Sequence, residues 1–482
     1  MPSEGKQDIL IFRTRLKPVM HSIWLVLVLS VLSSSVRAGT LGDLTYEITD
    51  GQVRITDCNE AAESELVIPA EIEGNRVTRI RYEAFRNCSS LTSITIPDSV
   101  TSIGQSAFSD CTSLTSIVIP EGVTSIGDYA FWRCSSLTSI VIPEGVTSIE
   151  SSAFGRCSSL ASITIPGSVT SIGSEAFRYC SSLTSIVIPE SVTSIGNDAF
   201  AWCRSLTSIV IPEGVTSIGD YAFDDCSSLS SITIGDSVTS IGHYAFESCS
   251  SLTAITMPDS VTSIGSEAFS GCSSLSSITI GDGVTSIVVG AFDDCSSLTS
   301  IAVAPGNSTY KSLDGVLFSK SGKSLLHYPA AKSGRDYIIP EGVTMIGPGA
   351  FNDCSSLTSI VIPESVTTIR YRWAFSGCSS LTSITIPQRF HSQSMANILG
   401  IGHLWPDGFF LPSSADPTPK LYIRLPLQLI LAGVQNTKVV IEATDSINGP
   451  WAEWRTVVVG EEGTTEVDLD EGAEKRFYRV RD

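Results

Sequence analysis

The 482-residue chain lacks most of what an enzyme needs. Its five histidines are scattered, and it has no G-x-S-x-G, G-x-x-x-x-G-K-[ST] or H-E-x-x-H motif. No C-x-x-C pair supplies metal ligands at short spacing. Basic residues are few, with 30 Lys and Arg against 50 Asp and Glu and a formal net charge of −20. The field of such a chain repels nucleic acid and anionic membranes. We therefore expect a protein that is not an enzyme, uses no cofactor or metal and binds no nucleic acid.

Long hydrophobic runs are also missing, apart from one short run near the N-terminus. Residues 23–32 are apolar, follow Arg13, Arg15 and Lys17, and precede small residues at Val36 and Ala38. This run is too short for a membrane span but has the organisation of an export signal. We expect cleavage after Ala38, no integral membrane span in the product, and a secreted or cell-surface location.

Cysteine is plentiful, but its spacing is not that of a disulfide framework. Twelve of the thirteen cysteines follow the motif A-F-x-x-C, and ten of these, from Cys88 to Cys295, recur every 23 residues. Cys354 and Cys378 continue the series, and only Cys58 lies outside it. A residue placed once per repeat forms an internal ladder, and a buried thiol behaves as a small hydrophobe. We expect structural thiols, with disulfides between neighbouring repeats as the alternative.

The chain is built from a unit that first appears at 84–104 and restarts every 23 residues. Later copies begin at Ala107, Ala130, Ala153, Ala176, Ala199, Ala222, Ala245, Ala268, Ala291, Ala350 and Ala374. A fixed period of this length predicts a solenoid. Within each unit, polar and apolar residues alternate along L-T-S-I-T-I, which predicts a short strand that ends at Pro. V-T-S-I predicts a second extended segment. A-F-x-x-C is expected to form a helical turn, with residues such as Asp128 and Asn197 at its N-cap. Strands of successive units should pair in parallel.

The pattern L-x-x-I-x-I-P-x-x-V-T-S-I-G-x-x-A-F-x-x-C-S-S resembles the BspA-like family of bacterial leucine-rich repeats. The resemblance extends from the N-terminal segment to Pro387. It implies a curved leucine-rich repeat solenoid on the surface of a bacterium, and a role in adhesion to host or matrix proteins or in coaggregation. The matching residues are structural, so the resemblance carries over no ligand contact.

Changes of pattern divide the rest of the chain. Asp50-Gly51 between alternating runs predicts a β-hairpin in an N-terminal cap. After Pro387 the repeats stop, and five strands of a small all-β module are expected from Leu421 onward, the first spanning 421–431. The expected segments are a signal peptide (1–38), a cap (39–83), the solenoid (84–387, with an island at about 304–337), a linker (388–420) and a C-terminal module (421–482).

The island interrupts the 23-residue period, and its two apolar runs predict a β-hairpin that projects from the solenoid. It carries four lysines in a region otherwise without them, namely Lys311, Lys320, Lys323 and Lys332. These are candidate ligand contacts, and a tolerated loop insertion is the alternative.

The strongest candidate site lies at the two positions after the repeat Phe, which the core leaves free to vary. In four successive repeats these positions and their neighbours hold large aromatic or basic residues, which adjacent coils should bring into one patch: Trp132, Arg133, Arg156, Arg178, Tyr179, Trp202 and Arg204. Trp, Tyr and Arg are enriched at binding hot spots, and Arg attracts carboxylates and sulfates. Chance surface variation is the alternative.

Acidic residues also recur in one register, after the first strand of most repeats, as at Glu213 and Asp259. A solvated ridge explains them better than calcium, because each repeat offers one carboxylate without D-x-D spacing. The sequence as a whole predicts a non-enzymatic, adhesin-like surface or secreted protein that binds a protein or glycan. A structural or self-associating envelope protein is the alternative, given the near-identical repeats and their chargeless strands.

Overall fold

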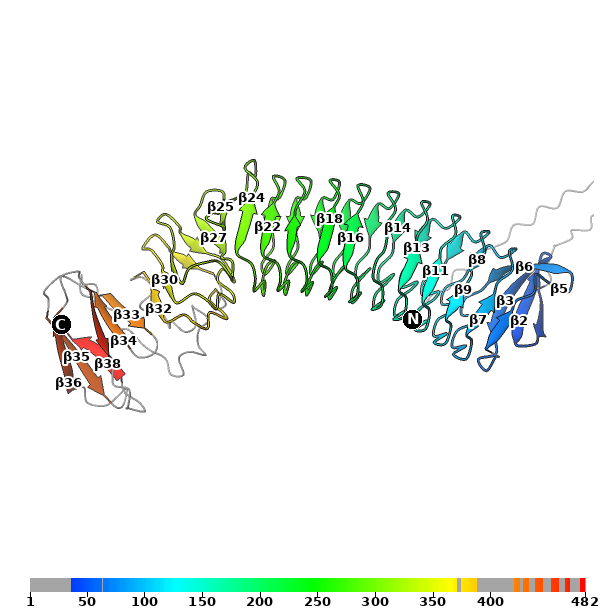
Figure 1. The fold of residues 1–482 in the computed structure, drawn as a ribbon, viewed down its shortest axis with the longest axis horizontal. Coiled ribbons are helices and arrows are strands. Elements are labelled where there is room, and N and C mark those ends of the chain that lie inside the picture. Colours follow the sequence, from blue (N-terminus) through cyan, green and yellow to red (C-terminus); the bar gives the residue numbers. More distant parts are fainter. Residues whose placement is uncertain are drawn as a thin grey trace, which may run out of the picture.

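The computed structural model describes residues 36–62, 64–370 and 374–387, together with the backbone of six strands between 420 and 481. The repeats stack into a long, curved solenoid with the strands β1–β6 at one end (Figure 1). The predicted signal core lies outside the described residues. The predicted cleavage point after Ala38 falls within the first strand, β1 (Arg37–Leu41).

Most coils contribute short strands to two parallel ladders. The first ladder is interrupted, because the L-T-S-I-V-I segment at 183–188 forms no strand. The L-T-S-I-T-I segments give β7 (Ser93–Thr95), β9 (Ser116–Ile117), β11 (Ser139–Val141), β13 (Ser162–Thr164), β16 (Ser208–Ile211), β18 (Ser231–Ile234), β20 (Ala254–Thr256), β22 (Ser277–Ile280), β24 (Ser300–Val303), β28 (Asp336–Ile338), β30 (Ser359–Val361) and β32 (Ser383–Thr385). The V-T-S-I segments give β8 (Ser102–Ile103), β10 (Ser125–Ile126), β12 (Ser148–Ile149), β14 (Ser171–Ile172), β15 (Ser194–Ile195), β17 (Ser217–Ile218), β19 (Ser240–Ile241), β21 (Ser263–Ile264), β23 (Ser286–Ile287), β29 (Met345–Ile346) and β31 (Thr368–Ile369). Within the uninterrupted repeats, paired residues are one repeat apart, as in Ile172 opposite Ile195.

A column of phenylalanine rings runs through the core. From Phe85 to Phe292, rings of successive coils stack with centroids 5.0 to 6.0 Å apart and planes within 14° of parallel. Beside it lies the cysteine column, in which the Sγ of Cys157 donates to the carbonyl of Phe131 at 3.1 Å. The repeated Ala, Phe, Cys and Leu are almost fully buried, with no more than 5% of any side chain exposed. Removing one such ring costs about 3 to 5 kcal/mol in typical cores.

The expected helical turns are wrong, because A-F-x-x-C forms tight turns and the described part of the chain contains no helix. Residues on both sides of Phe have positive φ, as at Ser106 (55°) and Asp110 (62°), which a right-handed helix does not allow. Their backbone amides bond across coils instead. Phe108 N donates to Ala130 O at 2.7 Å, and Asp110 N to Trp132 O at 2.8 Å.

The side chains expected to be helix N-caps instead accept hydrogen bonds from the backbone of the next coil. Asp128 Oδ1 accepts from the backbone N of Ser151 at 3.0 Å, and Asn197 Oδ1 from that of Asp220 at 2.9 Å. Both bonds join equivalent positions one repeat apart, so these side chains help to set the stacking register.

The N-terminal end of the solenoid is covered by a small sheet. β1 and β2 (Leu44–Thr49) pair antiparallel, as do β2 and β3 (Gln52–Cys58), around Asp50 and Gly51, which have φ of 54° and 73°. β5 (Glu71–Ile72) pairs with β6 (Asn75–Ile80), which joins β3 to β8. β4 (Glu65–Val67) pairs with β7 and so begins the other ladder.

The island does not project as a separate hairpin. Its strands β25 (Tyr310–Leu313), β26 (Val316–Ser319) and β27 (Ser324–His327) form an antiparallel meander, and β27 then pairs in parallel with β29 of the next coil. Leu317 packs in the core of the preceding coils, and Val316 and Phe318 pack in the core of the following ones. The insertion is therefore built into the stack as a joint between two cores.

Near the C-terminus the backbone forms β33 (Lys420–Arg424), β34 (Gln428–Ala432), β35 (Lys438–Thr444), β36 (Ala452–Val458), β37 (Thr464–Asp468) and β38 (Phe477–Arg481). Of the described residues here, all are in antiparallel strands, and β33 pairs with β32 of the last coil. The single strand expected over 421–431 is two strands.

All thirteen cysteines are buried and unpaired. Burial raises the pKa of the Cys157 thiol to about 12, which suppresses the reactive thiolate.

We expect the native protein to react slowly with a thiol reagent. In the unreduced, denatured protein, titration should find all thirteen thiols. Recovery of markedly fewer thiols would show that neighbouring coils are crosslinked.

Candidate functional site

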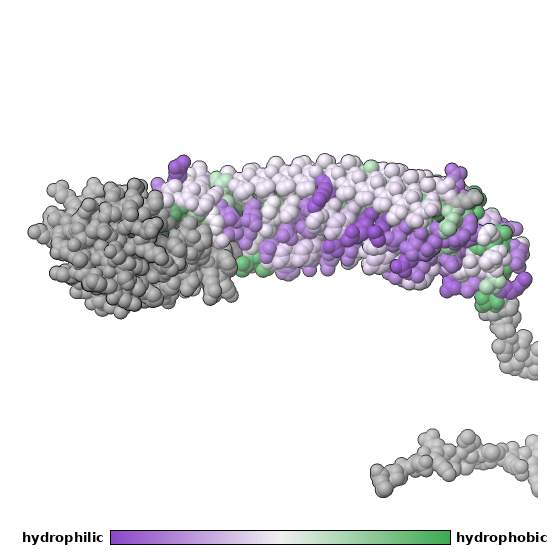
Figure 2. Space-filling view, turned by 90° about the horizontal axis from the view of Figure 1, so that it is seen from below, coloured by the Kyte–Doolittle hydropathy of each residue, from purple (hydrophilic) through white to green (hydrophobic). Residues whose placement is uncertain are grey.

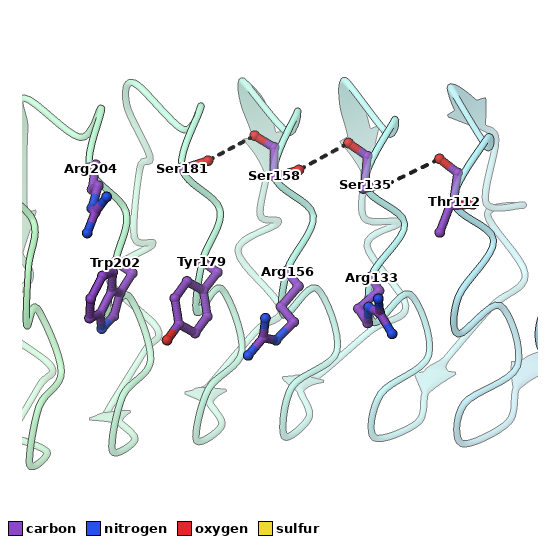
Figure 3. Close-up of a pocket in the computed structure, with 9 residues that line it drawn as sticks. All are labelled: Thr112, Arg133, Ser135, Arg156, Ser158, Tyr179, Ser181, Trp202 and Arg204. Carbon is purple, nitrogen blue, oxygen red and sulfur yellow. Dashed lines mark hydrogen bonds between the residues drawn. The ribbon is translucent and has the colours of Figure 1, made fainter.

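A shallow groove of about 450 Å³ crosses five consecutive coils on the turn side of the solenoid (Figure 3). One row of its residues comes from the second position after the repeat Phe, and a second row comes from the residue after the repeat Cys. The lining consists of Thr112, Arg133, Ser135, Arg156, Ser158, Tyr179, Ser181, Trp202 and Arg204. We call these nine residues the groove.

The first row holds bulky side chains on a backbone conformation that disfavours them. Arg133, Arg156, Tyr179 and Trp202 have φ of 59°, 62°, 61° and 65°. The same position in other coils is filled mostly by residues that tolerate positive φ, namely Asn87, Asp110, Asp225, Ser248, Gly271, Asp294, Asp353 and Gly377. A left-handed conformation costs an ordinary residue about 1 to 2 kcal/mol. At this position the bulky residues on a strained backbone lie in four neighbouring coils, although Tyr129, Tyr221 and Tyr244 have a positive φ at the other turn position. Strained residues that also line a groove are typical of functional sites.

Three side chains of this row and one of the second row form a continuous stack along the solenoid. The Arg156 guanidinium lies 4.5 Å from the Tyr179 ring centroid, and the Tyr179 and Trp202 centroids are 5.2 Å apart. Arg204 closes the stack, 4.5 Å from the Trp202 ring centroid. Each contact of this kind is worth about 0.5 to 1 kcal/mol at exposed sites. The stack therefore orients two guanidinium groups before any ligand arrives.

The three groove arginines differ in their acidic partners. Arg133 pairs with Asp110 at 2.9 Å, and Arg204 pairs with Asp225 at 2.6 Å. Among the described residues, no carboxylate lies within ion-pair distance of Arg156, whose recorded partner is the Tyr179 ring. The centre of the groove therefore holds a cation whose charge no neighbouring acid neutralises.

The second row is a ladder of hydroxyl groups. Ser135, Ser158 and Ser181 each donate to the carbonyl oxygen of the equivalent residue one coil earlier, at 3.3, 3.4 and 3.3 Å (Figure 3). With the proton so used, each hydroxyl oxygen keeps lone pairs that can accept from a ligand. Arg204 takes the serine position in its coil and closes this end of the groove.

An acidic pair lies in the coil after Trp202. Burial, together with the neighbouring Asp225 carboxylate, raises the pKa of Asp224 to about 6, although a hydrogen bond with Trp202 opposes the shift. Asp225 is the partner of Arg204. The positive groove thus ends at a negative edge.

The structure brings five of the seven patch residues predicted from sequence into the groove. Trp132 lies beside it, with the Arg133 guanidinium 5.2 Å from its ring centroid. Arg178 is held by Glu175 at 3.4 Å and Asp198 at 3.6 Å. The sequence interpretation missed the groove residues Thr112, Ser135, Ser158 and Ser181, although a hydroxyl residue directly after every repeat Cys except Cys203 was a visible signal.

The four island lysines do not form a free basic surface. Lys320 Nζ donates to the carbonyl of Asn307, and Lys332 Nζ lies 2.8 Å from Asp314 Oδ2. Lys311 is half-buried, and only Lys323 is exposed without a recorded side-chain partner among the described residues. The island interior is apolar, and burial lowers the pKa of His327 to about 4.

Two of the acidic residues that recur after the first strand of the repeats accept hydrogen bonds from the backbone of the next coil. Glu213 accepts from the backbone N of Asp236 at 2.7 Å, and Asp259 from that of Asp282 at 2.9 Å. Within the described ranges, no group of three or more His, Cys, Asp or Glu side chains is arranged to hold a metal ion. In the same ranges, no helix has the length and apolar character needed to cross a membrane.

Parallel short strands stacked at a period of 23 residues, with a buried Leu in each coil, define a leucine-rich repeat solenoid. Residues 78–207, 193–323 and 331–396 match the family described as the BspA type leucine rich repeat region, and the chain belongs to this family.

Two crystal structures of bacterial leucine-rich repeat proteins are similar to this chain. One, from Bacteroides ovatus, is 30% identical with a TM-score of 0.60, and the match covers 73% of this chain and 95% of the other. The second, a leucine rich cell surface protein from Faecalibacterium prausnitzii, is 33% identical with a TM-score of 0.50 and the same coverage. No curated protein matches the chain.

The strain at Arg156 can be measured by comparing two truncations. Arg156→Ala keeps a Cβ at φ 62°, whereas Arg156→Gly removes it. Both lose the guanidinium, so we expect the Gly variant to be more stable than the Ala variant by about 1 kcal/mol, the reverse of the usual order. Urea unfolding of both variants measures the difference.

Arg178, which lies in the next coil and has no positive φ, provides the matched control. There Arg178→Ala should be more stable than Arg178→Gly. The same order at both positions would contradict a strained backbone at Arg156.

Proposed function

We propose that this chain is a non-enzymatic, adhesin-like protein, secreted or held on a bacterial surface, which binds a protein or glycan through the groove. The observation that carries this proposal is that a strained backbone and side chains of the types found at binding sites occur at the same positions. Bulky residues at left-handed positions line the groove in four successive coils, whereas most equivalent positions elsewhere hold Asn, Asp, Ser or Gly. Family membership supports a surface role, because one similar protein is described as a cell surface protein.

The character of the surrounding surface supports recognition at a defined spot. Figure 2 shows hydrophilic residues in a band along the middle coils and apolar residues mainly in small patches toward the ends. The middle coils on the face shown therefore offer few apolar contacts to a ligand. The stacked Arg and aromatic side chains are of the types that dominate binding energy at interfaces.

Replacing Arg156 and Trp202 together by alanine should remove binding to any ligand found on an array of matrix proteins and glycans. Loss of two hot-spot side chains should weaken binding by at least roughly 30-fold. Titration of the captured ligand against both proteins measures the loss.

The matched control is Arg86→Ala with Tyr82→Ala, which removes an exposed arginine and an exposed aromatic residue from the first coil, outside the groove. It should bind like the parent protein. Equal binding by the groove variant and the parent would refute the assignment of the groove.

One observation favours the alternative of a structural, self-associating protein. The strand ladder carries exposed valines between its buried isoleucines, with Val118 and Val187 each 79% exposed and Val141 62% exposed. A chargeless, β-branched row is the kind of surface that pairs with a copy of itself.

Sedimentation velocity over a wide concentration range separates the two functions. A receptor that binds through the groove should remain monomeric, so its sedimentation coefficient should not rise with concentration. A rise that Val141→Lys with Val187→Lys abolishes would instead favour self-association through the valine row.

A further inference from the structure

We infer that the ligand of the groove is an anionic glycan, which lies along the solenoid axis and places an acidic group on Arg156. This inference rests on the function proposed above and names the chemical class of its ligand. The acidic group is a carboxylate or a sulfate, since both match the donor geometry of a guanidinium.

The charge of the ligand follows from the pairing of the arginines. Arg156 is not neutralised by any described carboxylate, and its guanidinium carbon lies over the Tyr179 ring, 4.5 Å from the centroid. Arg133 lies one coil before Arg156 and Arg204 lies two coils after it. Each of these two guanidinium groups uses some of its N–H donors on a carboxylate, Asp110 or Asp225. A guanidinium carries five N–H donors, so both flanking groups keep donors for a ligand. The chain is strongly acidic overall, but screening limits that repulsion beyond about 8 Å, whereas contact at Arg156 is direct.

The stacked rings argue against a neutral sugar. One face of Tyr179 is covered by Arg156, and the Tyr179 ring also packs against Trp202. Trp202 in turn has Arg204 over its ring. A neutral sugar is bound largely by packing on a free ring face, and these faces are already taken. The groove offers guanidinium N–H groups and hydroxyls to its ligand instead.

The size and lining of the groove favour a glycan over a protein surface. A stable protein interface buries about 800 Å² on each partner around an apolar centre, whereas 450 Å³ lies in the range of small-ligand sites. None of the nine lining residues is aliphatic, so a peptide would find no pocket for apolar side chains. Ser135, Ser158 and Ser181 supply a row of acceptors for sugar hydroxyls along the opposite wall.

The repeat supplies a matching period. Groups in the first row recur once per coil, and the Tyr179 and Trp202 centroids, one coil apart, are separated by 5.2 Å. A chain molecule lying parallel to the solenoid axis therefore meets a hydroxyl acceptor in four successive coils and a guanidinium at Arg133, Arg156 and Arg204. This arrangement suits a polymer of acidic sugars better than a single small anion.

The test uses the full chain and five probes: oligogalacturonide, its methyl ester, dextran sulfate, neutral dextran and poly-L-glutamate. We expect binding to oligogalacturonide or to dextran sulfate, and the one that binds identifies the acidic group as carboxylate or sulfate. Esterification or removal of sulfate should abolish binding. Arg156→Gln, which keeps the Cβ and the backbone strain, should weaken it roughly tenfold or more, because it removes a charge-assisted hydrogen bond. Arg86→Gln should bind like the parent.

The remaining outcomes overturn the inference in separable ways. Tighter binding to poly-L-glutamate than to both acidic glycans would contradict the assignment of a glycan ligand. The same holds if Arg156→Gln binds every acidic probe as tightly as the parent protein does. If an array ligand still requires the groove in either case, the proposed function stands without this inference. If no array ligand requires the groove, both fall.

Discussion

The fold depends on backbone hydrogen bonds between equivalent positions of successive coils. Ser125 pairs with Ser102 and Ile195 with Ile172, and the turns add bonds such as Phe108 N to Ala130 O at 2.7 Å. Because these bonds together place each strand residue opposite its equivalent one repeat away, a side chain at one repeat position must lie above its equivalents. The phenylalanine column, the cysteine column and the hydroxyl ladder all follow from this register. The groove follows from it too, since it brings together residues 92 positions apart, from Thr112 to Arg204.

Most of this organisation is predictable from the sequence, because the period itself encodes it. The repeat predicts the solenoid, the two extended segments per coil, the buried Cys and Phe, and the grouping of Arg156, Tyr179 and Trp202. The helical turns were wrong for a local reason. Phe and Cys three residues apart suit a helix face, but they suit a tight turn equally well, and the sequence pattern does not reveal φ. Asn87, Asp110, Asp225 and Gly271 at one position were the available sign of a left-handed backbone.

The island shows where sequence reasoning reaches its limit. Its apolar runs predict strands, yet whether a hairpin projects or joins the stack depends on which core its alternate residues face. Leu317 packs with the preceding coils and Phe318 with the following ones, so the meander transmits the stack across the interruption. Two island residues also connect the two parts of the ring column. The ring centroids of Phe292 and His327 are 5.6 Å apart, and those of Tyr328 and Phe351 are 5.3 Å apart. Two lysines that looked like docking groups instead hold this joint together.

A repeat protein also offers a control that a globular domain lacks, since every position is present many times in nearly the same environment. The residue between Phe and Cys can therefore be compared across coils at constant backbone conformation. Where that residue is Asn, Asp or Gly, it fits its φ and needs no other explanation. Where it is Arg, Tyr or Trp, the backbone penalty is carried by coils that are otherwise as well packed as the rest. Packing cannot be the reason for these residues, because their neighbours in the ladder pack equally well without them. What remains is the surface that they build, a row of donors around an arginine that no described acid neutralises.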